Sequence, residues 1–334
     1  MSGPSAPAAR EVAPGVIQVR LPLPFALDHI NVWLLADGDG WTLVDTGVGD
    51  APTRTRWERL ERTVLRGRPV RRILCTHHHP DHVGLAGWLA ARWGVRVWCS
   101  RKEWRHARIG TGEPPAEAEA GALAFYRRAG VPRRQAEALA PQAHTYRRLV
   151  SPLPGGHRAV RDGEGIRIGE ARWRAIVGRG HSPEHVCLYD ADRAVLVAGD
   201  QVLPRISPNV SVWPLEPDAD PLSEFLATLE RLLRLPERLL VLPSHGRPFG
   251  GLHRRIHQLA LHHRQHLAAV VAACRRPRTA YQVTRLLFPR RLDPHQTTFA
   301  LGESIAHLNH LVARGVLERR RDAGPALDWY RLPR

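Results

Sequence analysis

The densest group of chemically active side chains lies in the stretch Thr76-His77-His78-His79-Pro80-Asp81-His82-Val83-Gly84. His77, His79, Asp81 and His82 offer imidazole nitrogens and a carboxylate, the ligands that zinc and similar cations accept together. A β-type run, residues 70–75, precedes the stretch and a helical pattern follows from Leu85, so we expect a strand-to-helix loop. A solvated histidine-rich loop is the alternative, but it predicts neither a particular spacing nor distant partners, and both are present.

The spacing His77-x-His79-x-Asp81-His82 resembles the HxHxDH signature of the metallo-β-lactamase superfamily. Further segments resemble the remaining motifs of that family in the same order. They are Leu43-Val44-Asp45-Thr46-Gly47 for the DTG turn, Gly180-His181-Ser182-Pro183 for the next histidine, Ala198-Gly199-Asp200 for the bridging carboxylate and Pro243-Ser244-His245-Gly246 for the last histidine. Five ordered motifs between roughly residues 15 and 250 are too many for a chance match.

The resemblance implies a site with two divalent metal ions, for which zinc is the default and iron or manganese also suit the ligands. It implies that His77, His79 and His181 hold the first metal, that Asp81, His82 and His245 hold the second, and that Asp200 bridges both. Asp45 would support the ligands from behind. Asp81 and Asp200 would be the catalytic carboxylates, and the nucleophile would be a hydroxide bridging the two metals. This ligand set resembles that of hydroxyacylglutathione hydrolases and lactonases. It lacks the cysteine ligand of many true β-lactamases, because Cys187 and Cys274 fall outside the motifs.

The elements that must position these motifs follow an α/β pattern. We expect strands at 16–19, 31–35, 41–44, 70–75 and 95–99 with a hairpin turn at 37–40, and helices at 52–66 and 85–93. The second half repeats this plan, with strands at 165–168, 173–177, 186–189, 194–198 and 239–242 and a helix at 222–235. Such a double unit matches the αββα sandwich of the resembled superfamily, in which the metal site lies at the shared edge of two sheets.

We expect a flexible N-terminus, residues 1–14, followed by a catalytic domain, residues 15–250. Residues 101–150 read as helices, with ranges such as 116–129 and 133–140, and in relatives an insertion here often forms a lid over the site. Tyr126 is a candidate for contact with substrate, along with Trp104, Phe125 and Tyr146, although packing explains such aromatic residues equally well. In the loop after Asp200, Arg205 and Asn209, together with Ser207, are further candidates.

Three residues beside the motifs carry weaker expectations. His78 alternates with two ligands, so it should face away from the metals. Glu184 is expected to cap a following segment rather than to contact substrate. His185 is expected to be a buried hydrogen-bonding histidine.

A long amphipathic helix is predicted at 251–276, and it connects to a C-terminal domain at 277–334. Two pairs in it, His253 with His257 and His262 with His266, are spaced four apart, but no carboxylate or third ligand accompanies them in the sequence, so packing or solvent contact is the favoured interpretation. Helices at 280–288 and 296–314 and a hairpin formed by 315–318 and 329–332 resemble a winged-helix appendage. Arg290, Arg291, Arg319, Arg320 and Arg321 would give it a basic surface.

Composition fits a globular protein, with 334 residues of which 43% are hydrophobic. The four cysteines form no CxxC pair and no secretory or membrane-spanning segment is evident, so a reduced, cytoplasmic protein is expected. The net charge is +17, but the basic residues are arginines apart from Lys102, as a compositional bias of the genome would also produce. The surplus lies mainly in 101–150 and 251–334, where it would attract an anionic partner.

These observations favour a metal-dependent hydrolase of a small anionic thioester, activated ester or lactone, such as an acyl-CoA or acyl-glutathione. A thiol leaves without a dedicated general acid because its pKa is only about 8.5. A metal-dependent phosphodiesterase or endoribonuclease is the alternative, with nucleic acid as a less favoured partner. A non-catalytic binding protein is disfavoured because every ligand position is filled. A homodimer remains open.

Overall fold

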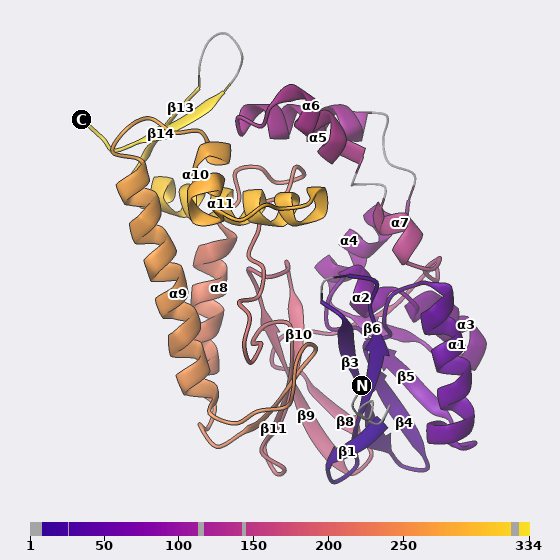
Figure 1. Cartoon of the computed structure of the whole chain (residues 1–334). Coiled ribbons are helices and arrows are strands. Elements are labelled where there is room, and N and C mark those ends of the chain that lie inside the picture. Colours follow the sequence, from indigo (N-terminus) through magenta and orange to yellow (C-terminus); the bar gives the residue numbers. More distant parts are fainter. Residues whose placement is uncertain (1–8, 26, 113–116, 142–144, 322–326) are drawn as a thin grey trace, which may run out of the picture.

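Two β-sheets lie face to face at the centre of the molecule, and helices cover their outer faces (Figure 1). The computed structural model describes residues 9–25, 27–112, 117–141, 145–321 and 327–334. The first sheet has the order β1 (Ala9–Ala13), β2 (Val16–Pro22), β3 (His29–Asp37), β4 (Gly40–Val44), β5 (Val70–Leu74), β6 (Val97–Cys99) and β7 (Arg158–Ala159). The second has the order β12 (Leu240–Pro243), β11 (Val195–Gly199), β10 (His185–Asp190), β9 (Ala171–Gly178) and β8 (Gly165–Ile168).

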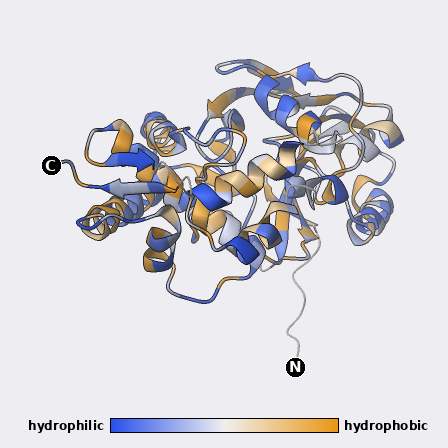
Figure 2. Ribbon diagram, turned by 90° about the horizontal axis from the view of Figure 1, so that it is seen from above, coloured by the Kyte–Doolittle hydropathy of each residue, from blue (hydrophilic) through white to orange (hydrophobic). Residues whose placement is uncertain are grey.

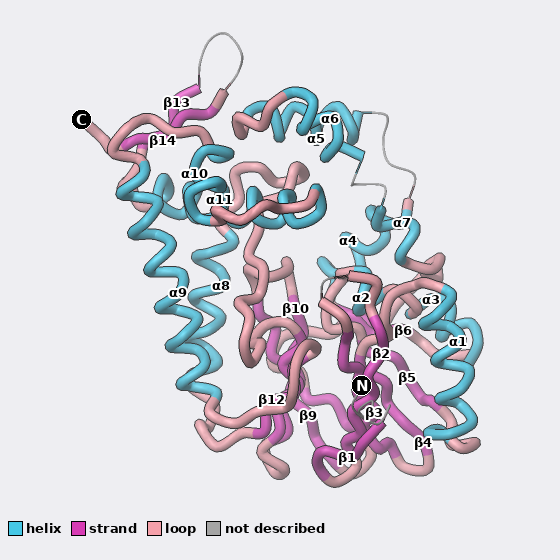
Figure 3. The backbone as a smooth tube through the Cα atoms, in the orientation of Figure 1, coloured by secondary structure: helices cyan, strands magenta, loops and turns pink. Residues whose placement is uncertain are grey.

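The helices of the catalytic part are α1 (Ala51–Leu60), which continues as the π-helical turn η1 (Glu61–Leu65), α2 (Pro80–Val83), α3 (Ala86–Trp93) and α8 (Pro221–Leu232). The inserted helices are α4 (Arg101–Thr111), α5 (Glu117–Arg128), α6 (Arg133–Leu139) and α7 (Thr145–Leu149). The C-terminal region contains α9 (Leu252–Ala273), α10 (Ala280–Leu287), α11 (Pro294–Ala313) and the hairpin β13 (Glu318–Arg321) and β14 (Asp328–Arg331). Figure 3 shows these classes of element along the chain.

Three apolar layers hold the sandwich together. Trp33 and Trp173 lie in the layer between the two sheets, Trp57 packs in the layer between the first sheet and its helices, and Phe225 packs in the layer under α8 and α9. Strand β3 is buried along most of its length because it is covered on both faces, which explains its nearly continuous apolar sequence. The expected αββα sandwich is confirmed.

The strands that precede the motifs end at one edge of the two sheets. Strands β4 and β5 are parallel neighbours in the first sheet, and β11 and β12 are parallel neighbours in the second. The carboxyl ends of parallel neighbours meet at one edge, so the segments that begin at Asp45, Cys75, Asp200 and Ser244 leave the sheets close together. This topology explains why motifs far apart in sequence can form one site.

The inserted helices divide between two cores. Trp104 and Ala107 of α4 pack with the first sheet and its helices. Phe125 and Tyr126 of α5, together with α6, pack instead in one apolar cluster with α9, α10 and α11. The amide of Tyr281 donates to the carbonyl of Ala129 at 2.8 Å, which joins α10 to the insertion. The expected helices are therefore present, and their action as a lid stays a prediction.

Two expected boundaries are wrong. Residues 9–13 form strand β1 paired with β2, although we expected a flexible N-terminus up to residue 14. Residues 1–8 lie outside the described residues. The first strand of the C-terminal hairpin begins at Glu318 rather than at Gly315. The reason is that the amides of Val316 and Leu317 still donate to the carbonyl of Leu311 and complete the end of α11.

The order of the C-terminal elements, helix, helix and hairpin, is confirmed, while their likeness to a winged helix stays a prediction. In Figure 2 the peripheral helices carry hydrophilic and hydrophobic residues on the same ribbon, as expected for helices with one packed face. A search of the described residues finds no helix with the length and apolar character needed to cross a membrane.

Replacement of Trp57 tests the packing of α1 onto the first sheet. The side chain is fully buried, and its indole nitrogen donates to the carbonyl of Thr46 at 2.9 Å. We expect Trp57→Ala to lower the free energy of unfolding by about 3–5 kcal/mol, measured by urea denaturation. Leu261→Ala on α9, where the side chain is 48% exposed, is the control and should change it by less than about 0.5 kcal/mol. Equal effects of the two changes would contradict the packing described here.

Candidate metal centre

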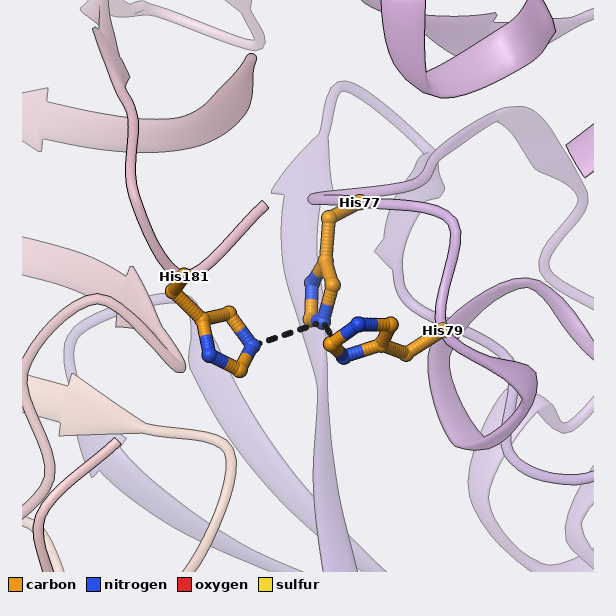
Figure 4. A group of neighbouring side chains, drawn as sticks. All are labelled: His77, His79 and His181. Carbon is orange, nitrogen blue, oxygen red and sulfur yellow. Dashed lines mark hydrogen bonds between the residues drawn. The ribbon is translucent and has the colours of Figure 1, made fainter. Parts of the chain in front are cut away.

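Three histidines meet in the first half of the site. His77 Nε2 lies 2.9 Å from His79 Nδ1 and 3.2 Å from His181 Nε2. Figure 4 shows the three rings turned toward one another from two separate segments of the chain. Bonds of about 2.0–2.1 Å place two nitrogens on a tetrahedral zinc about 3.3 Å apart, so these separations suit a shared cation.

The second half of the site is built around Asp200. Its Oδ1 lies 3.6 Å from His82 Nε2, and its Oδ2 lies 3.4 Å from His245 Nε2 and 3.6 Å from His181 Nε2. Asp81 Oδ2 is also 3.4 Å from His245 Nε2. Asp200 therefore stands between the group of His77, His79 and His181 and the group of Asp81, His82 and His245, each of which could hold a metal ion.

Buried polar atoms without partners support a cation at this place. His82 Nε2 and Asp200 Oδ1 are both buried and lack a hydrogen-bond partner among the described residues. An unsatisfied buried carboxylate oxygen or imidazole nitrogen is costly. A divalent ion between them would satisfy both atoms, so the residues fit the metal that the motifs imply.

Asp45 fixes the loop that carries the histidines. Its carboxylate is fully buried and accepts hydrogen bonds from the Thr76 amide at 2.7 Å, from the Thr76 hydroxyl at 2.9 Å and from His82 Nδ1 at 2.8 Å. The bond to Nδ1 leaves His82 Nε2 to face Asp81 and Asp200. This is the supporting contact expected for a histidine that binds metal.

Main-chain carbonyls orient two further histidines. The carbonyl of Asn209 accepts from His181 Nδ1 at 2.7 Å, and the carbonyl of His29 accepts from His245 Nδ1 at 2.8 Å. Because a carbonyl only accepts, the proton lies on Nδ1 in each ring. Nε2 of His181 and Nε2 of His245 are thus the nitrogens that face Asp200.

Burial and charge act in opposite directions on these rings. Burial, together with the neighbouring imidazoles, lowers the pKa of His77 and His79 well below the usual value, which keeps them in the neutral form that binds metal. Burial also lowers the pKa of His245, but Asp200 and Asp81 raise it to about 10. A metal must displace such a proton, so binding to this half of the site releases protons.

Glu103 on α4 is a residue that the motifs did not reveal. Its fully buried carboxylate accepts from the amide of His78 at 2.9 Å, from His78 Nδ1 at 2.5 Å, from the Ser182 hydroxyl at 2.7 Å and from the amide of Glu184 at 2.6 Å. It therefore joins the loop of His77 and His79 to the loop of His181. In the sequence it is one of several charged residues of a predicted helix, so no local signal marked it.

The weaker expectations largely hold. His78 Nδ1 faces Glu103 rather than the group of His77, His79 and His181, and the carbonyl of His78 accepts from the Tyr146 hydroxyl at 2.5 Å. His185 Nε2 accepts from the Asp200 amide at 3.1 Å, so His185 is a buried hydrogen-bonding histidine as expected. Glu184 does act as a cap, but on α4, where its carboxylate accepts from the amide of Lys102 at 3.1 Å rather than on the segment that follows it.

Three of the candidates for substrate contact, Tyr126, Asn209 and Arg205, lie in different surroundings. Tyr126 lies in the apolar cluster with the C-terminal helices, where burial raises its pKa to about 12, so packing accounts for its position and a substrate role stays a prediction. Asn209 reaches the site through its main-chain carbonyl rather than its side chain. Arg205 is exposed on the loop after Asp200, and its role stays a prediction.

All four cysteines are buried and free. Burial raises the pKa of Cys187 to about 12 and that of Cys274 to about 11, and it raises the pKa of Cys75 and Cys99 as well. They are neutral packing residues, and the groups of side chains described above that could hold a metal contain only histidine and carboxylate ligands.

Comparison with known proteins agrees with this site. The profile of the metallo-beta-lactamase superfamily matches residues 26–245, and that of the metallo-beta-lactamase-like C-terminal domain matches residues 267–331. The chain belongs to the metallo-beta-lactamase superfamily and carries its C-terminal domain. It is accordingly a metal-dependent hydrolase, and the fold implies divalent metal ions.

Two solved structures and one curated relative resemble nearly the whole chain. A beta-lactamase domain protein from Burkholderia ambifaria is 42% identical, with a TM-score of 0.90 over 99% of this chain and 96% of that one. The metallo-beta-lactamase family protein TTHA1429 from Thermus thermophilus is 31% identical, with a TM-score of 0.83 over 97% and 100%. The probable metallo-hydrolase YqjP from Bacillus subtilis is 27% identical over 89% of this chain and 92% of its own length.

Removing the charge of Asp45 should weaken metal binding. Asp45→Asn keeps the size of the side chain but replaces one acceptor oxygen by a donor that faces the donors of Thr76 and His82. We expect zinc affinity to fall by about 10–100-fold, measured by competition with a chromogenic chelator. Asp39→Asn, in the exposed turn between β3 and β4, is the control and should bind zinc like the wild type. Unchanged affinity of Asp45→Asn would show that His82 does not need this contact.

Glu103 should make stability depend on pH. Burial acts to raise its pKa, but the nearby charge of His78 and hydrogen bonds from His78, Glu184 and Ser182 outweigh burial and hold the pKa at about 2, below the ordinary value of 4.5. The carboxylate therefore stabilises the fold above about pH 4.5, and this contribution is lost as the pH falls toward 2. In urea denaturation, the difference between wild type and Glu103→Gln should be largest near neutral pH and shrink below about pH 4.5.

The matched control for this change is Glu230→Gln, at an exposed position of α8. Its difference from the wild type should be small across the same pH range. A difference for Glu103→Gln that does not depend on pH would mean that the charge of Glu103 contributes nothing to stability.

Proposed function

We propose that this protein uses two divalent metal ions, most simply zinc, to hydrolyse a thioester of the acyl-CoA or acyl-carrier type. In this proposal His77, His79 and His181 hold one ion, Asp81, His82 and His245 hold the other, and Asp200 bridges them. The observation that carries the proposal is the position of Asp200, whose two oxygens face both groups of ligands within 3.6 Å.

When bound, such ions supply a water molecule ionised near neutral pH and polarise the carbonyl that it attacks. The protein supplies the geometry. Asp45 and the carbonyls of Asn209 and His29 hold the rings so that the free nitrogens converge. Glu103 keeps the two loops of the first group at a fixed separation. Rigid ligands of this kind need little reorganisation during the reaction.

Two similar proteins support a thioester as the substrate. The protein named acyl-coenzyme A thioesterase MBLAC2 from Homo sapiens is 34% identical over 104 residues, which are 30% of this chain and 34% of that protein. The atrochrysone carboxyl ACP thioesterase from Aspergillus fumigatus is 24% identical over 76% of this chain and 63% of its own length. A thioester also suits a site whose acids and imidazoles are engaged as ligands, because a thiolate leaves without a separate proton donor.

A row of aromatic rings offers a surface for the acyl group. Phe25 of the β2–β3 connection stacks on His295 with ring centres 5.7 Å apart, His295 contacts Phe299 at 4.8 Å, and Phe299 contacts Trp213 at 5.5 Å. The row links the segment before His29 to the loop after Asp200, and these two segments also supply the carbonyls that orient the histidines. Leu215, which is 64% exposed on the same loop, extends the apolar surface.

Three of the five arginines expected to form a basic surface favour this proposal over hydrolysis of RNA. Arg319 pairs with Asp218 at 2.6 Å, Arg321 with Asp328 at 2.9 Å and Arg320 with Glu318 at 3.5 Å. Arginines engaged with carboxylates attract phosphates less strongly than free ones. The exposed Arg205 is a proposed contact for the anionic part of a small substrate.

The deciding experiment compares thioester and RNA turnover by protein of known metal content. We expect a panel of acyl-CoA substrates with chains of increasing length to be hydrolysed, and kcat/KM to fall more than about 100-fold in Asp200→Asn. Asp192→Asn, at an exposed position of the β10–β11 turn, is the matched control and should keep full activity.

The same experiment can reject the proposal. Metal-dependent cleavage of single-stranded RNA that is lost in Asp200→Asn, without thioester turnover, would replace it by the nuclease alternative. Thioester turnover that survives in Asp200→Asn would remove Asp200 from its bridging role.

A further inference from the structure

A second group of potential metal ligands lies between α9 and α11, in the C-terminal region. Helix α9 contributes His262, His263 and His266, and α11 contributes Glu303 and His307. Two overlapping sets from this group have ligand atoms within 4.8 Å of one another, and both sets include Glu303. The proposed function does not use any of these residues.

The distances around Glu303 suit a shared cation. Its Oε1 lies 3.7 Å from His266 Nδ1 and 3.9 Å from His262 Nε2. These separations are longer than hydrogen bonds and slightly longer than the spacing of about 3.3 Å between ligands of a tetrahedral zinc. Both histidines therefore lie near the same carboxylate oxygen.

Helix geometry places the ligands on facing surfaces. His262 and His266 are four residues apart on α9, and Glu303 and His307 are four residues apart on α11, so each pair shares one face of its helix. The sequence favoured packing for His262 and His266 because no carboxylate or third ligand was visible near them. Folding supplies both from α11, which begins 28 residues after His266 in the sequence.

The protonation of His307 places the lone pair on its outer nitrogen, Nε2, which accepts a hydrogen bond from His263 Nδ1. His307 Nδ1 lies 2.8 Å from the carbonyl of Glu303 and must donate to it, so Nε2 carries the lone pair. Histidines that bind metals commonly donate their other nitrogen to a carbonyl in this way. His263 Nδ1 approaches this Nε2 at 3.2 Å.

Two buried nitrogens in the group lack partners. His263 Nε2 and His266 Nδ1 have no hydrogen-bond partner among the described residues, and the side chain of His263 is fully buried. Burial lowers the pKa of His263 to about 2 and also lowers the pKa of His266 and His307, so the rings stay neutral. Neutral imidazoles with unsatisfied lone pairs are ready ligands.

Aromatic rings flank this group of ligands, and the next histidine on α11 has other partners. The ring of Phe225 meets His263 edge-on at 5.4 Å, and that of Phe288 meets His266 at 5.9 Å. One helical turn further along α11, His310 is engaged elsewhere, with Ser223 at 3.0 Å and Asp220 at 3.3 Å.

We propose that His266, Glu303 and His307, completed by His262 from the more exposed side, bind one divalent cation, most simply zinc, that joins α9 to α11. Three imidazoles and one carboxylate are a usual ligand set for zinc. Binding of the ion at His307 Nε2 would replace the hydrogen bond that this nitrogen accepts from His263 Nδ1. The ion would be structural, because four protein ligands leave no open position for a substrate.

Such an ion would also steady the aromatic row described above. The carbonyl of Gly302, next to Glu303, accepts from the amide of Val212 at 3.1 Å, and the carbonyl of Phe299 accepts from the Ser211 hydroxyl at 3.3 Å. Helix α11 therefore holds the loop that follows Asp200. Fixing α11 against α9 fixes this loop as well.

The test counts bound metal and does not depend on activity. Metal-free full-length protein is titrated with zinc alone, as wild type, as the double variant His266→Gln with Glu303→Gln, and as His257→Gln. His257 is exposed on the same α9 and is the matched control. We expect the wild type and His257→Gln to bind one more equivalent of zinc than the double variant. We also expect zinc to raise the Tm of these two proteins more than that of the double variant. Equal stoichiometry in all three proteins would overturn the proposal.

Anomalous diffraction at the zinc edge from crystals of the wild-type protein is a second test. It does not use the double variant, so it remains valid if that variant fails to fold. We expect a peak about 2.0–2.2 Å from the ligand atoms of His266, Glu303 and His307. No peak there at saturating zinc would also overturn the proposal. Asp200→Asn distinguishes the two sites. It should weaken the anomalous peaks at the metal centre and leave the peak between α9 and α11 unchanged.

Discussion

The structure depends first on one buried carboxylate, that of Asp45. A charge at this depth is tolerated only when hydrogen bonds replace its water, and Thr76 and His82 provide them. Asp45 itself adopts a positive φ of 62°, an uncommon conformation for a residue with a side chain. The backbone is thus strained after β4, and this strain lets one carboxylate hold both Thr76, at the start of the histidine loop, and His82, on the helical turn that follows it. Pairing of β4 with β5 brings these segments within reach.

The sequence was most informative where spacing along the chain is itself the geometry. His77, His79, Asp81 and His82 lie on one loop, so their order already restricts where their side chains point. The strands and helices of the sandwich followed from periodicity for the same reason. The later motifs, such as those of His181 and Asp200, could be connected to the loop only through the resemblance to a family, because no local rule joins residues more than a hundred positions apart.

Contacts made by folding alone could not be predicted. Glu103 is 25 residues from His78 and about 80 from Ser182, and it looked like an ordinary acid on a helix surface. The main-chain carbonyl of Asn209 accepts from His181, and no sequence pattern reports the direction of a loop carbonyl. Likewise, α5 and α6 follow α4 in the chain but share their core with α9–α11, a choice made by tertiary packing.

The buried state of the four cysteines has a practical consequence for spectroscopy. A thiol must be ionised and accessible to react with maleimides or iodoacetamides, and Cys75, Cys99, Cys187 and Cys274 are neither. A single cysteine introduced on an exposed turn would therefore react well before the native ones while the protein stays folded. Fluorophores or spin labels can then be attached to chosen elements without first removing cysteines from the core. A pair of such labels would report the distance between α9 and the two sheets in solution.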